Sequence, residues 1–588
     1  MPDNRQHAKG EARPQARSVQ ARRLRLLATT DLHMQLGGAA SGLSRIASLI
    51  AEERATAARE GAICLLVDNG DALQGGALGE LAAEEPARPH PVMRAFAHLG
   101  YDVLGLGNHD FDLGLERLEA VLAQAACPVV CSNLGPVRGV LPWLVLERAG
   151  LRIGVISALP PQTAVWNRHH LEGRAEARDI VAAAREAVQA LRLEGCDLVL
   201  ALAHSGPGAA DALPGAENAA LAVAALDGID AVIAGHTHER HADPSVPLVL
   251  PGANGSDLGV IALEAGAEGR WHVATAALRP VSAAVAEDPA LASLVAEDHA
   301  RAEALMARPV GRVEAPLHSY FTFIAPDRAL ALVAAAQAAA LRPLLAGWPE
   351  AGLPLLSAAA PGLFGGRSGP LAYADIPAGP VALRHLVELQ PFPNDLHAVV
   401  VTGAQLGDWI EHSAGLFNRI VPGADPVALI DPGLPGHDFD VIHGVACEID
   451  LSVPSRFLSD GSLRQGGARR ARRLTYAGRA VMPDQRFVVA VNSYRSSGGG
   501  NVAALRGAER LDLPGTGLRA ALAGYLGGAA HDPLEQAPPP WGFVPLPGAR
   551  AWLQTGPGAQ GHLGELAGRG VEAAGIDGEG FLRLILPL

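Results

Sequence analysis

Short apolar runs alternate with longer amphipathic stretches through the first half of the chain. The runs are rich in Val, Leu, Ile and Ala, as is typical of strands in a covered sheet. Strands are predicted at residues 24–28, 62–67, 102–106, 129–131, 151–157, 197–201 and 231–234. Helices are predicted between them at residues 43–59, 91–99, 115–125 and 175–194. This alternation predicts an α/β layered domain over residues 24–280, with its sheet covered on both faces.

A single helix is predicted to connect this domain to the rest of the chain. Residues 288–307 are strong helix formers, with Pro289 at the first helical position and no Gly or Pro before Pro309. Residues 281–310 are therefore expected to form a linker helix, followed by a second α/β or α+β domain over residues 311–538. A Pro-rich run at 537–540 marks its end, and residues 539–588 are expected to be a small appendage with a last strand at 581–586.

Composition and charge narrow the class of protein. The 588 residues are 49% hydrophobic and 18% charged, enough to build two cores. A net charge of -14 opposes binding to long nucleic acids but is compatible with a small nucleotide. No uncharged apolar run of about 18 residues is present, so no membrane span is expected. The oligomeric state stays open.

Residues 1–23 are polar and basic, which predicts a disordered tail. They contain no apolar run of the kind that a secretory signal needs. We therefore expect a cytoplasmic protein, with a periplasmic location as the alternative.

Five polar clusters directly follow predicted strands. They are Asp31-Leu32-His33, Asp68-Asn69-Gly70-Asp71, Gly107-Asn108-His109-Asp110-Phe111-Asp112, Ala203-His204-Ser205 and Gly235-His236-Thr237-His238. Taken alone, Asp-x-His is more typical of a solvated turn, Gly-Asp is as common in a plain turn, and Gly-His-Thr-His fits an exposed loop. Gly-Asn-His-Asp is more specific. A lone His204 is more typical of a core histidine. Because the carboxyl ends of strands in such a domain meet at one edge, we expect the five clusters to share one cleft.

The side chains of these clusters indicate a metal site. Asp, Asn and His without Cys suit Mn, Zn, Fe, Co or Ni. The seven candidate ligands are Asp31, His33, Asp71, Asn108, His204, His236 and His238. Seven ligands with Asp71 as a bridge fit two divalent ions about 3.5–4 Å apart, the arrangement used for phosphoester hydrolysis. We expect Mn, Zn or Co, and we expect Gly70, Gly107 and Gly235 to let the backbone turn sharply.

The order of these motifs resembles that of the calcineurin-like metallophosphoesterases. The segments LRLLATTDLH, LGLGNHDFDLG and VIAGHTHERH are similar to the 5'-nucleotidase family within that group. The resemblance implies a first metal bound by Asp31, His33, Asp71 and His238, and a second bound by Asp71, Asn108, His204 and His236. It also implies that His109, paired with Asp112, forms a catalytic dyad near the leaving group.

The resemblance extends over residues 24–540. The segments LSAAAPGLFGGRSGP, ADIPAGPVALRHL, VTGAQLGDWIEHSAG, FDVIHGVACEIDLS and VAVNSYRSSGGGN resemble the bacterial bifunctional 2',3'-cyclic-nucleotide 2'-phosphodiesterase/3'-nucleotidases. This implies a layered α/β sandwich joined by a helix to a 5'-nucleotidase-type α/β (α+β) substrate domain. It also implies hydrolysis of 2',3'-cyclic nucleotides and 3'-nucleotides. A 5'-nucleotidase or UDP-sugar hydrolase is the alternative, and a catalytically silent nucleotide-binding protein is a more distant one.

A nucleotide base is expected to bind near Tyr494. The Tyr494 ring can stack on any base, Asn492 can hydrogen-bond ring nitrogens, and glycines 498–500 would let the backbone approach the ligand. The alternative is a hairpin loop with one surface tyrosine.

The aromatic partner of Tyr494 is left open. Relatives often carry Tyr-Asn-Phe-Asp where this chain has His437-Asp438-Phe439-Asp440. The candidates for the second ring are His437, Phe439 and Phe417. Arg367 is a candidate for contact with the substrate phosphate or ribose, and a solvated arginine is the alternative.

Overall fold

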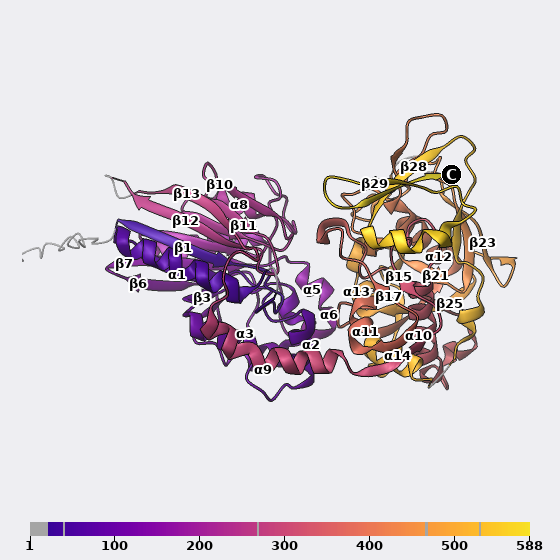
Figure 1. Ribbon diagram of the computed structural model, residues 1–588, viewed down its shortest axis with the longest axis horizontal. Coiled ribbons are helices and arrows are strands. Elements are labelled where there is room, and N and C mark those ends of the chain that lie inside the picture. Colours follow the sequence, from indigo (N-terminus) through magenta and orange to yellow (C-terminus); the bar gives the residue numbers. More distant parts are fainter. Residues whose placement is uncertain (1–21, 39–40, 267–269, 465–467, 529–530) are drawn as a thin grey trace, which may run out of the picture.

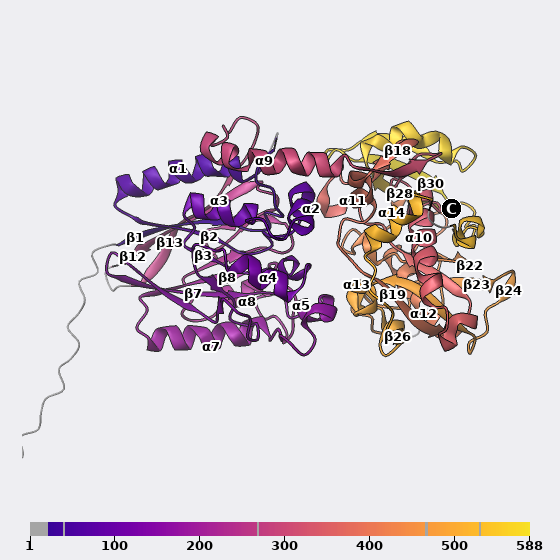
Figure 2. The same cartoon turned by 90° about the horizontal axis from the view of Figure 1, so that it is seen from below.

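The computed structural model describes residues 22–38, 41–266, 270–464, 468–528 and 531–588. Two α/β bodies lie side by side and are joined by the helix α9 (Pro289–Met306), as Figures 1 and 2 show. The expected tail falls almost wholly outside the described residues, of which Arg22 and Arg23 are the first. The fold class expected from the sequence is confirmed in both bodies.

The N-terminal domain contains two mixed sheets. The first has the order β13 (Trp271–Pro280), β12 (Asp257–Ala265), β1 (Arg23–Thr29), β2 (Ile63–Asp68), β3 (Val103–Leu104), β4 (Val129–Val130) and β5 (Val140–Leu141). The second has the order β10 (Arg240–Asp243), β11 (Leu248–Pro251), β9 (Ala231–Ala234), β8 (Leu198–Ala203), β7 (Leu151–Ala158) and β6 (Leu144–Arg148). Strands β1 to β5 run parallel, as do β7, β8, β9 and β11.

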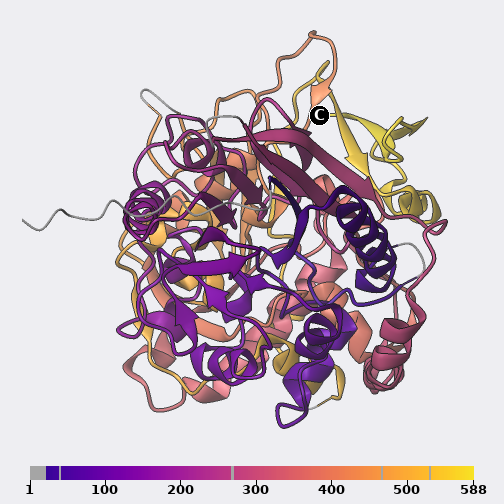
Figure 3. The same cartoon turned by 90° about the vertical axis from the view of Figure 1, so that its left-hand side faces the viewer.

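The two sheets pack face to face, with helices on both outer faces (Figure 3). Helices α1 (Leu43–Glu60), α2 (Gly76–Glu84), α3 (Pro91–Leu99), α4 (Leu115–Leu122) and α9 cover the first sheet. Helices α7 (Ile180–Leu193) and α8 (Ala220–Ala224) cover the second. Each sheet is covered on both faces, as expected, but the domain has two sheets where the pattern of apolar runs indicated one. A strand has apolar side chains on its two faces whether it lies between a second sheet and a layer of helices or between two layers of helices. The hydrophobic pattern of the sequence therefore cannot distinguish these two arrangements.

The predicted elements differ from the observed ones mainly at their ends. Strand β9 and helix α3 have the predicted bounds. Helix α7 begins later than predicted because the Asp179 side chain accepts a hydrogen bond from the Ala182 N–H and caps the helix there.

The C-terminal domain is built on a five-stranded sheet. Its order is β21 (Val441–His443), β16 (Leu355–Ala359), β25 (Arg486–Asn492), β19 (Leu396–Thr402) and β26 (Glu509–Leu511). Helices α10 (Arg328–Leu344) and α14 (Leu518–Leu526) pack against one face, and α12 (Gly403–Ser413) packs against the other.

Residues 539–588, expected as a separate appendage, share sheets with the C-terminal domain. Strand β27 (Trp541–Phe543) pairs with β22 (Val445–Ile449), and β28 (Arg550–Thr555) pairs with β20 (Val427–Ala428). The predicted last strand is present as β30 (Leu582–Pro587), between β28 and β29 (Glu572–Ile576). Trp541 and Leu553 enter the same hydrophobic core as α12, so this segment contributes to the core of the domain.

Candidate metal centre and substrate site

All seven predicted metal ligands meet at one edge of the N-terminal domain. Asp31 and His33 follow β1, Asp71 follows β2 and Asn108 follows β3, all in the first sheet. The second sheet contributes His204 after β8, and His236 and His238 after β9. The two sheets therefore present the carboxyl ends of these strands at a common edge.

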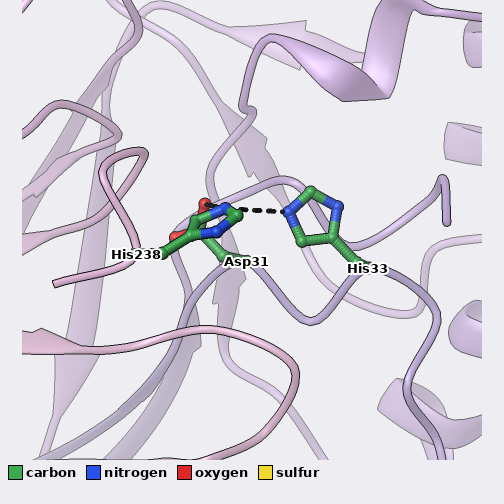
Figure 4. A group of neighbouring side chains, drawn as sticks. All are labelled: Asp31, His33 and His238. Atoms are coloured by element: carbon green, nitrogen blue, oxygen red, sulfur yellow. Dashed lines mark hydrogen bonds and ion pairs between the residues drawn. The ribbon is translucent and has the colours of Figure 1, made fainter. Parts of the chain in front are cut away.

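The first group of donors consists of Asp31, His33 and His238, whose ligand atoms lie within 4.8 Å of one another (Figure 4). The Nε2 atoms of the two histidines are 3.2 Å apart, and His238 Nε2 is 3.5 Å from Asp31 Oδ1. Burial lowers the pKa of His33 to about 4, which keeps this imidazole neutral. Two ring nitrogens pointing at each other beside a carboxylate fit a shared divalent cation.

The second group consists of Asp31, Asp71 and His204, all buried. His204 Nδ1 lies 2.9 Å from the Asn69 carbonyl oxygen and can donate to it. Its Nε2 lies 3.0 Å from Asp71 Oδ2 and has no partner in hydrogen-bond geometry among the described residues. Burial alone would lower the pKa of His204, but the charges of Asp71 and Asp31 raise it to about 10. A divalent cation between these groups would take the place of that proton.

Asn108 and His236 complete the set and are held by neighbours that the sequence did not indicate. His236 Nδ1 lies 2.9 Å from Asn108 Oδ1, and His236 Nε2 lies 2.9 Å from Glu217 Oε1. A Glu217 carboxylate that accepts from Nε2–H leaves Nδ1 as the donor toward a metal. Asn167 Nδ2 donates to the Asn108 carbonyl oxygen at 3.1 Å, and the Trp166 ring stacks on His236 at 5.7 Å.

The backbone at this edge is strained. Five of the seven predicted ligands have positive φ values: Asp31 (50°), His33 (45°), Asp71 (54°), His236 (70°) and His238 (60°). Such conformations cost on the order of 1–3 kcal/mol each in non-glycine residues and concentrate at functional sites. This strain supports the assignment of the edge as the functional site.

The glycines of the motifs have two different roles. Gly70 has a φ of 95° and turns the chain, as expected. Gly107 and Gly235 do not have positive φ, so the expectation of a sharp turn was wrong for them. A Cβ atom at Gly107 would lie 2.2 Å from Asp71 Oδ1, and one at Gly235 would lie 2.7 Å from Asp31 Oδ2. These two glycines leave room for the carboxylates.

His109 and Asp112 form the expected pair, on and directly after the short 3₁₀-helix η1 (His109–Phe111). His109 Nδ1 lies 2.9 Å from Asp112 Oδ2, and the His109 backbone N–H donates to Asp71 Oδ1 at 2.7 Å. Burial would lower the pKa of His109, but the charges of Asp112 and Asp71 raise it to about 9. The ring is therefore held as an imidazolium whose Nε2–H is not used by Asp112.

Phe392 of the C-terminal domain lies on the His109 ring. The two rings are nearly parallel, with centroids 5.4 Å apart and an interplanar angle of 8°. The sequence did not predict this contact, because no pattern in a loop indicates which part of another domain it will reach. The contact places the dyad at the junction of the two domains.

Tyr494 lies on the short helix α13 (Ser493–Ser496), directly after β25. The His437 ring faces it edge-on, with centroids 6.1 Å apart. Phe417 and Phe439 are each 2% exposed and pack in the core with Trp541, so the structure does not bring them to the side of Tyr494. His437 is thus the only one of the three candidates that faces the Tyr494 ring.

The loop that carries His437 is fixed by Arg495. The buried Arg495 guanidinium pairs with Asp440 at 2.8 Å and donates to the His437 carbonyl oxygen at 2.7 Å. Asn492 Oδ1 accepts from the Arg495 backbone N–H at 2.7 Å and caps α13, which leaves the Asn492 amide nitrogen for other contacts.

Gly499 and Gly500 make room within the protein itself. A Cβ atom at Gly499 would lie 2.4 Å from the Tyr494 ring, and one at Gly500 would lie 1.7 Å from Arg495 Nη1. The structure therefore explains these two glycines by the packing of Tyr494 and Arg495, where the sequence suggested a close approach to a ligand.

Arg367 is exposed on the 3₁₀-turn η3 (Gly366–Ser368). Phe364, three residues earlier, has its ring centroid 5.9 Å from that of His437. Arg367 is thus near the ring pair along the chain, and no contact joins it to another candidate among the described residues.

The Glu217 carboxylate lies near both the candidate metal centre and the pair of rings formed by His437 and Tyr494. Burial lowers the pKa of His437 and raises the pKa of Tyr494 to about 12, and the Glu217 charge acts on both groups. The same carboxylate contacts His236. Glu217 therefore contacts the predicted ligand His236 and lies within electrostatic range of His437 and Tyr494.

Comparisons with known proteins agree with this geometry. Residues 24–240 match the family model "Calcineurin-like phosphoesterase", and residues 324–507 match "5'-nucleotidase, C-terminal domain". The chain is 34% identical over 530 residues to the 2',3'-cyclic-nucleotide 2'-phosphodiesterase/3'-nucleotidase of Salmonella typhimurium, covering 81% of each chain.

Two further relatives extend the comparison. The chain is 32% identical over 545 residues to the Trifunctional nucleotide phosphoesterase protein YfkN of Bacillus subtilis. The aligned region covers 84% of this chain but only 36% of that protein. The solved structure of a 5'-nucleotidase precursor from Thermus thermophilus has a TM-score of 0.60 at 20% identity, covering 89% of this chain and 100% of that one. The second likeness shows the fold alone.

The fold and the donor set together define a metallophosphoesterase, an enzyme that uses divalent metal ions. The chain belongs to the 5'-nucleotidase family of calcineurin-like phosphoesterases. This confirms the resemblance seen in the sequence motifs. Within the described residues, no helix is both long enough and apolar enough to cross a bilayer.

Proposed function

We propose that this enzyme hydrolyses 2',3'-cyclic nucleotides to 3'-nucleotides, and 3'-nucleotides to nucleoside and phosphate. The relative from Salmonella typhimurium carries this pair of activities in its name. The observation that supports the proposal best is the convergence of seven donors from two sheets, next to His109 and to the pair of rings formed by His437 and Tyr494.

Two divalent cations are proposed to bind at this edge, and Mn, Zn or Co suits the donors. One site has the ligands Asp31, His33, Asp71 and His238, and the other has Asp71, Asn108, His204 and His236. Asp71 would bridge, because one carboxylate can serve two ions; its Oδ2 lies 3.0 Å from His204 Nε2, and its Oδ1 accepts from the His109 backbone N–H. When bound, such a pair makes water acidic and neutralises charge on the phosphate.

His109 is proposed to protonate the departing ribose oxygen. Asp112 engages Nδ1, so the imidazolium would deliver its proton from Nε2. In the cyclic substrate, water would form a bond to phosphorus while the bond from phosphorus to O2' breaks and O2' takes the proton. In the second reaction the same exchange would occur at O3'.

The nucleoside is proposed to lie against the C-terminal domain. Tyr494 would stack on the base, His437 would contact it from the other side, and the Asn492 amide would hydrogen-bond a ring nitrogen. Arg367 would reach the phosphate or the ribose. Phe417 and Phe439 support this site from the core and are not proposed to touch the substrate.

The domain bounds are proposed as 24–280 for the metallophosphoesterase domain and 281–310 for the linker helix. The substrate domain would extend from 311 to 588. It includes residues 539–588 because their strands pair with β20 and β22.

A panel of nucleotides tests this proposal. Initial rates with 2',3'-cyclic AMP, 3'-AMP, 5'-AMP and a UDP-sugar are compared under one metal. We expect the first two to turn over fastest; a clear preference for 5'-AMP or the UDP-sugar would instead make the chain a 5'-nucleotidase or sugar-nucleotide hydrolase. Bis-p-nitrophenyl phosphate is the control for catalysis, because a silent nucleotide-binding protein would not hydrolyse it.

A further inference from the structure

A second cluster of metal-type side chains lies in the C-terminal domain and shares no residue with the metal centre. It consists of His318 on β15 (Leu317–His318) and of His562 and Glu565 on the 3₁₀-helix η9 (Pro557–Leu566). Their ligand atoms lie within 4.8 Å of one another, as do the ligand atoms within each donor group of the metal centre.

The three donors surround one point. His318 Nε2 lies 3.2 Å from Glu565 Oε1, and His562 Nδ1 lies 3.8 Å from the same oxygen. The two imidazole centroids are 4.2 Å apart. These separations are those of donors that share a tetrahedral cation, whose bonds to nitrogen and oxygen are about 2.0–2.2 Å long.

Neighbouring groups already orient the donors. His562 Nε2 lies 3.1 Å from Asp375 Oδ1, and the Tyr320 hydroxyl donates to Asp375 Oδ2 at 3.0 Å. An Nε2–H that donates to Asp375 leaves the lone pair of His562 on Nδ1, toward Glu565, as carboxylates do for metal-binding histidines. His318 is 5% exposed, so its ring is held in place by the surrounding protein.

We propose that His318, His562 and Glu565 bind a divalent cation of the zinc class, with water in the fourth position. Two imidazoles and one carboxylate are a ligand set that zinc accepts. The Arg328 guanidinium, 3.7 Å from Glu565 Oε1, is 57% exposed and can turn into solvent when the cation binds.

The role of this cation is structural. It ties η9, in the last part of the chain, to the two-stranded sheet of β15 and β17 (Asp375–Ile376). His318 and Glu565 are 247 residues apart in sequence, so the tie joins distant parts of the chain, and a cation that binds only the folded chain stabilises it. The cation would hold residues 539–588 in place and take no part in hydrolysis.

Zinc content after loading and desalting tests the proposal on the full chain. His562→Gln and Glu565→Gln should each bind one zinc ion fewer per chain than wild type. The matched control is His531→Gln, which changes an exposed histidine paired with Glu535 at 3.4 Å in the same domain and should keep the wild-type content. Both site variants should also lose part of the rise in melting temperature that zinc gives wild type.

Hydrolysis of bis-p-nitrophenyl phosphate with manganese monitors folding and should be unchanged in all three variants. Equal zinc content in wild type and the two site variants would overturn the proposal and leave the cluster as a hydrogen-bonded network. Loss of zinc together with loss of hydrolysis would also overturn it, because the loss would then reflect general damage.

Discussion

Three histidines of the metal centre have one ring nitrogen engaged by the protein and the other turned toward the site. His204 can donate from Nδ1 to the Asn69 carbonyl, and His236 from Nε2 to Glu217. His33 Nδ1 lies 3.3 Å from the Gln74 carbonyl oxygen. Such contacts select the tautomer and the ring orientation before a metal arrives, and they raise the basicity of the donor nitrogen.

Removal of the His109 imidazole should separate catalysis from metal binding. We expect His109→Ala to lower kcat for 3'-AMP by about 10²–10⁴-fold, the usual contribution of a positioned proton donor. Its metal content should match wild type, because the ring faces Asp112 and Phe392. The exposed His98→Ala is the matched control. If His109→Ala instead loses metal to the same extent as it loses activity, His109 acts as a metal ligand.

Glu217 should be needed for metal affinity through His236. We expect Glu217→Ala to weaken metal binding by about 10–100-fold, the usual effect of losing a carboxylate behind a ligating histidine. Glu217→Gln keeps an acceptor oxygen and should recover part of the loss. Titration of metal into enzyme that a chelator has freed of metal measures the affinity of both variants. Glu172→Ala, which changes an exposed residue, is the control. Equal affinities for all variants would exclude this role.

Tyr494 should contribute to substrate affinity through its ring. Loss of stacking in Tyr494→Ala removes about 1–3 kcal/mol, which corresponds to a rise in KM for 3'-AMP of about 5- to 150-fold. Tyr494→Phe keeps the ring and should keep KM close to wild type. The two KM values, measured side by side, check this. A large effect of the Phe variant would mean that the hydroxyl, not the ring face, binds the substrate.

At the scale of elements, the sequence predicted best what depends on local pattern. The bounds of α3 and β9 follow from Pro91, the apolar run and the flanking glycines, all of which act within a few residues. The strand ends also indicated that all seven predicted metal ligands would lie together, as the structure shows. Features that depend on distant packing were missed: the second sheet, the pairing of β27 with β22, and the approach of Phe392 to His109.

Glu217 was missed for a related reason. It lies in a loop well past the end of β8, where a carboxylate is most often solvated, and only the folded chain brings it to His236. Likewise, the sequence left three rings open beside Tyr494 because burial of Phe417 and Phe439 depends on contacts with Trp541.

Buried histidines should make the fold sensitive to acid. Burial lowers the pKa of His443, on β21, to about 4 from an ordinary value of 6.5. Below about pH 6.5 this histidine is therefore protonated in the unfolded chain but stays neutral in the folded chain. The free energy of unfolding consequently falls as the pH drops toward 4. We expect a loss of about 2 kcal/mol from this residue between pH 7 and pH 5.

The comparison variant for this effect is His443→Leu. Its melting temperature should fall less than that of wild type between pH 7 and pH 5, because it has no such group to protonate. Identical pH dependence in the two proteins would contradict the assignment.

At the scale of the whole molecule, the site lies between two domains that contact each other. Helix α9 packs on the N-terminal domain through Leu291 and Val295 and is therefore part of that domain. Across the junction, Arg519 of α14 forms an ion pair with Glu80 of α2, in addition to the contact between Phe392 and His109. We expect these contacts to open when substrate enters, with the residues directly after α9 as the hinge.

The central claim is that one edge of the N-terminal domain holds two cations bridged by Asp71. Anomalous diffraction from crystals grown with manganese tests it most directly. We expect two manganese peaks about 3.5–4 Å apart, one beside His33 and His238 and the other beside Asn108 and His236. A single peak at this edge, or two peaks that do not share Asp71, would contradict it.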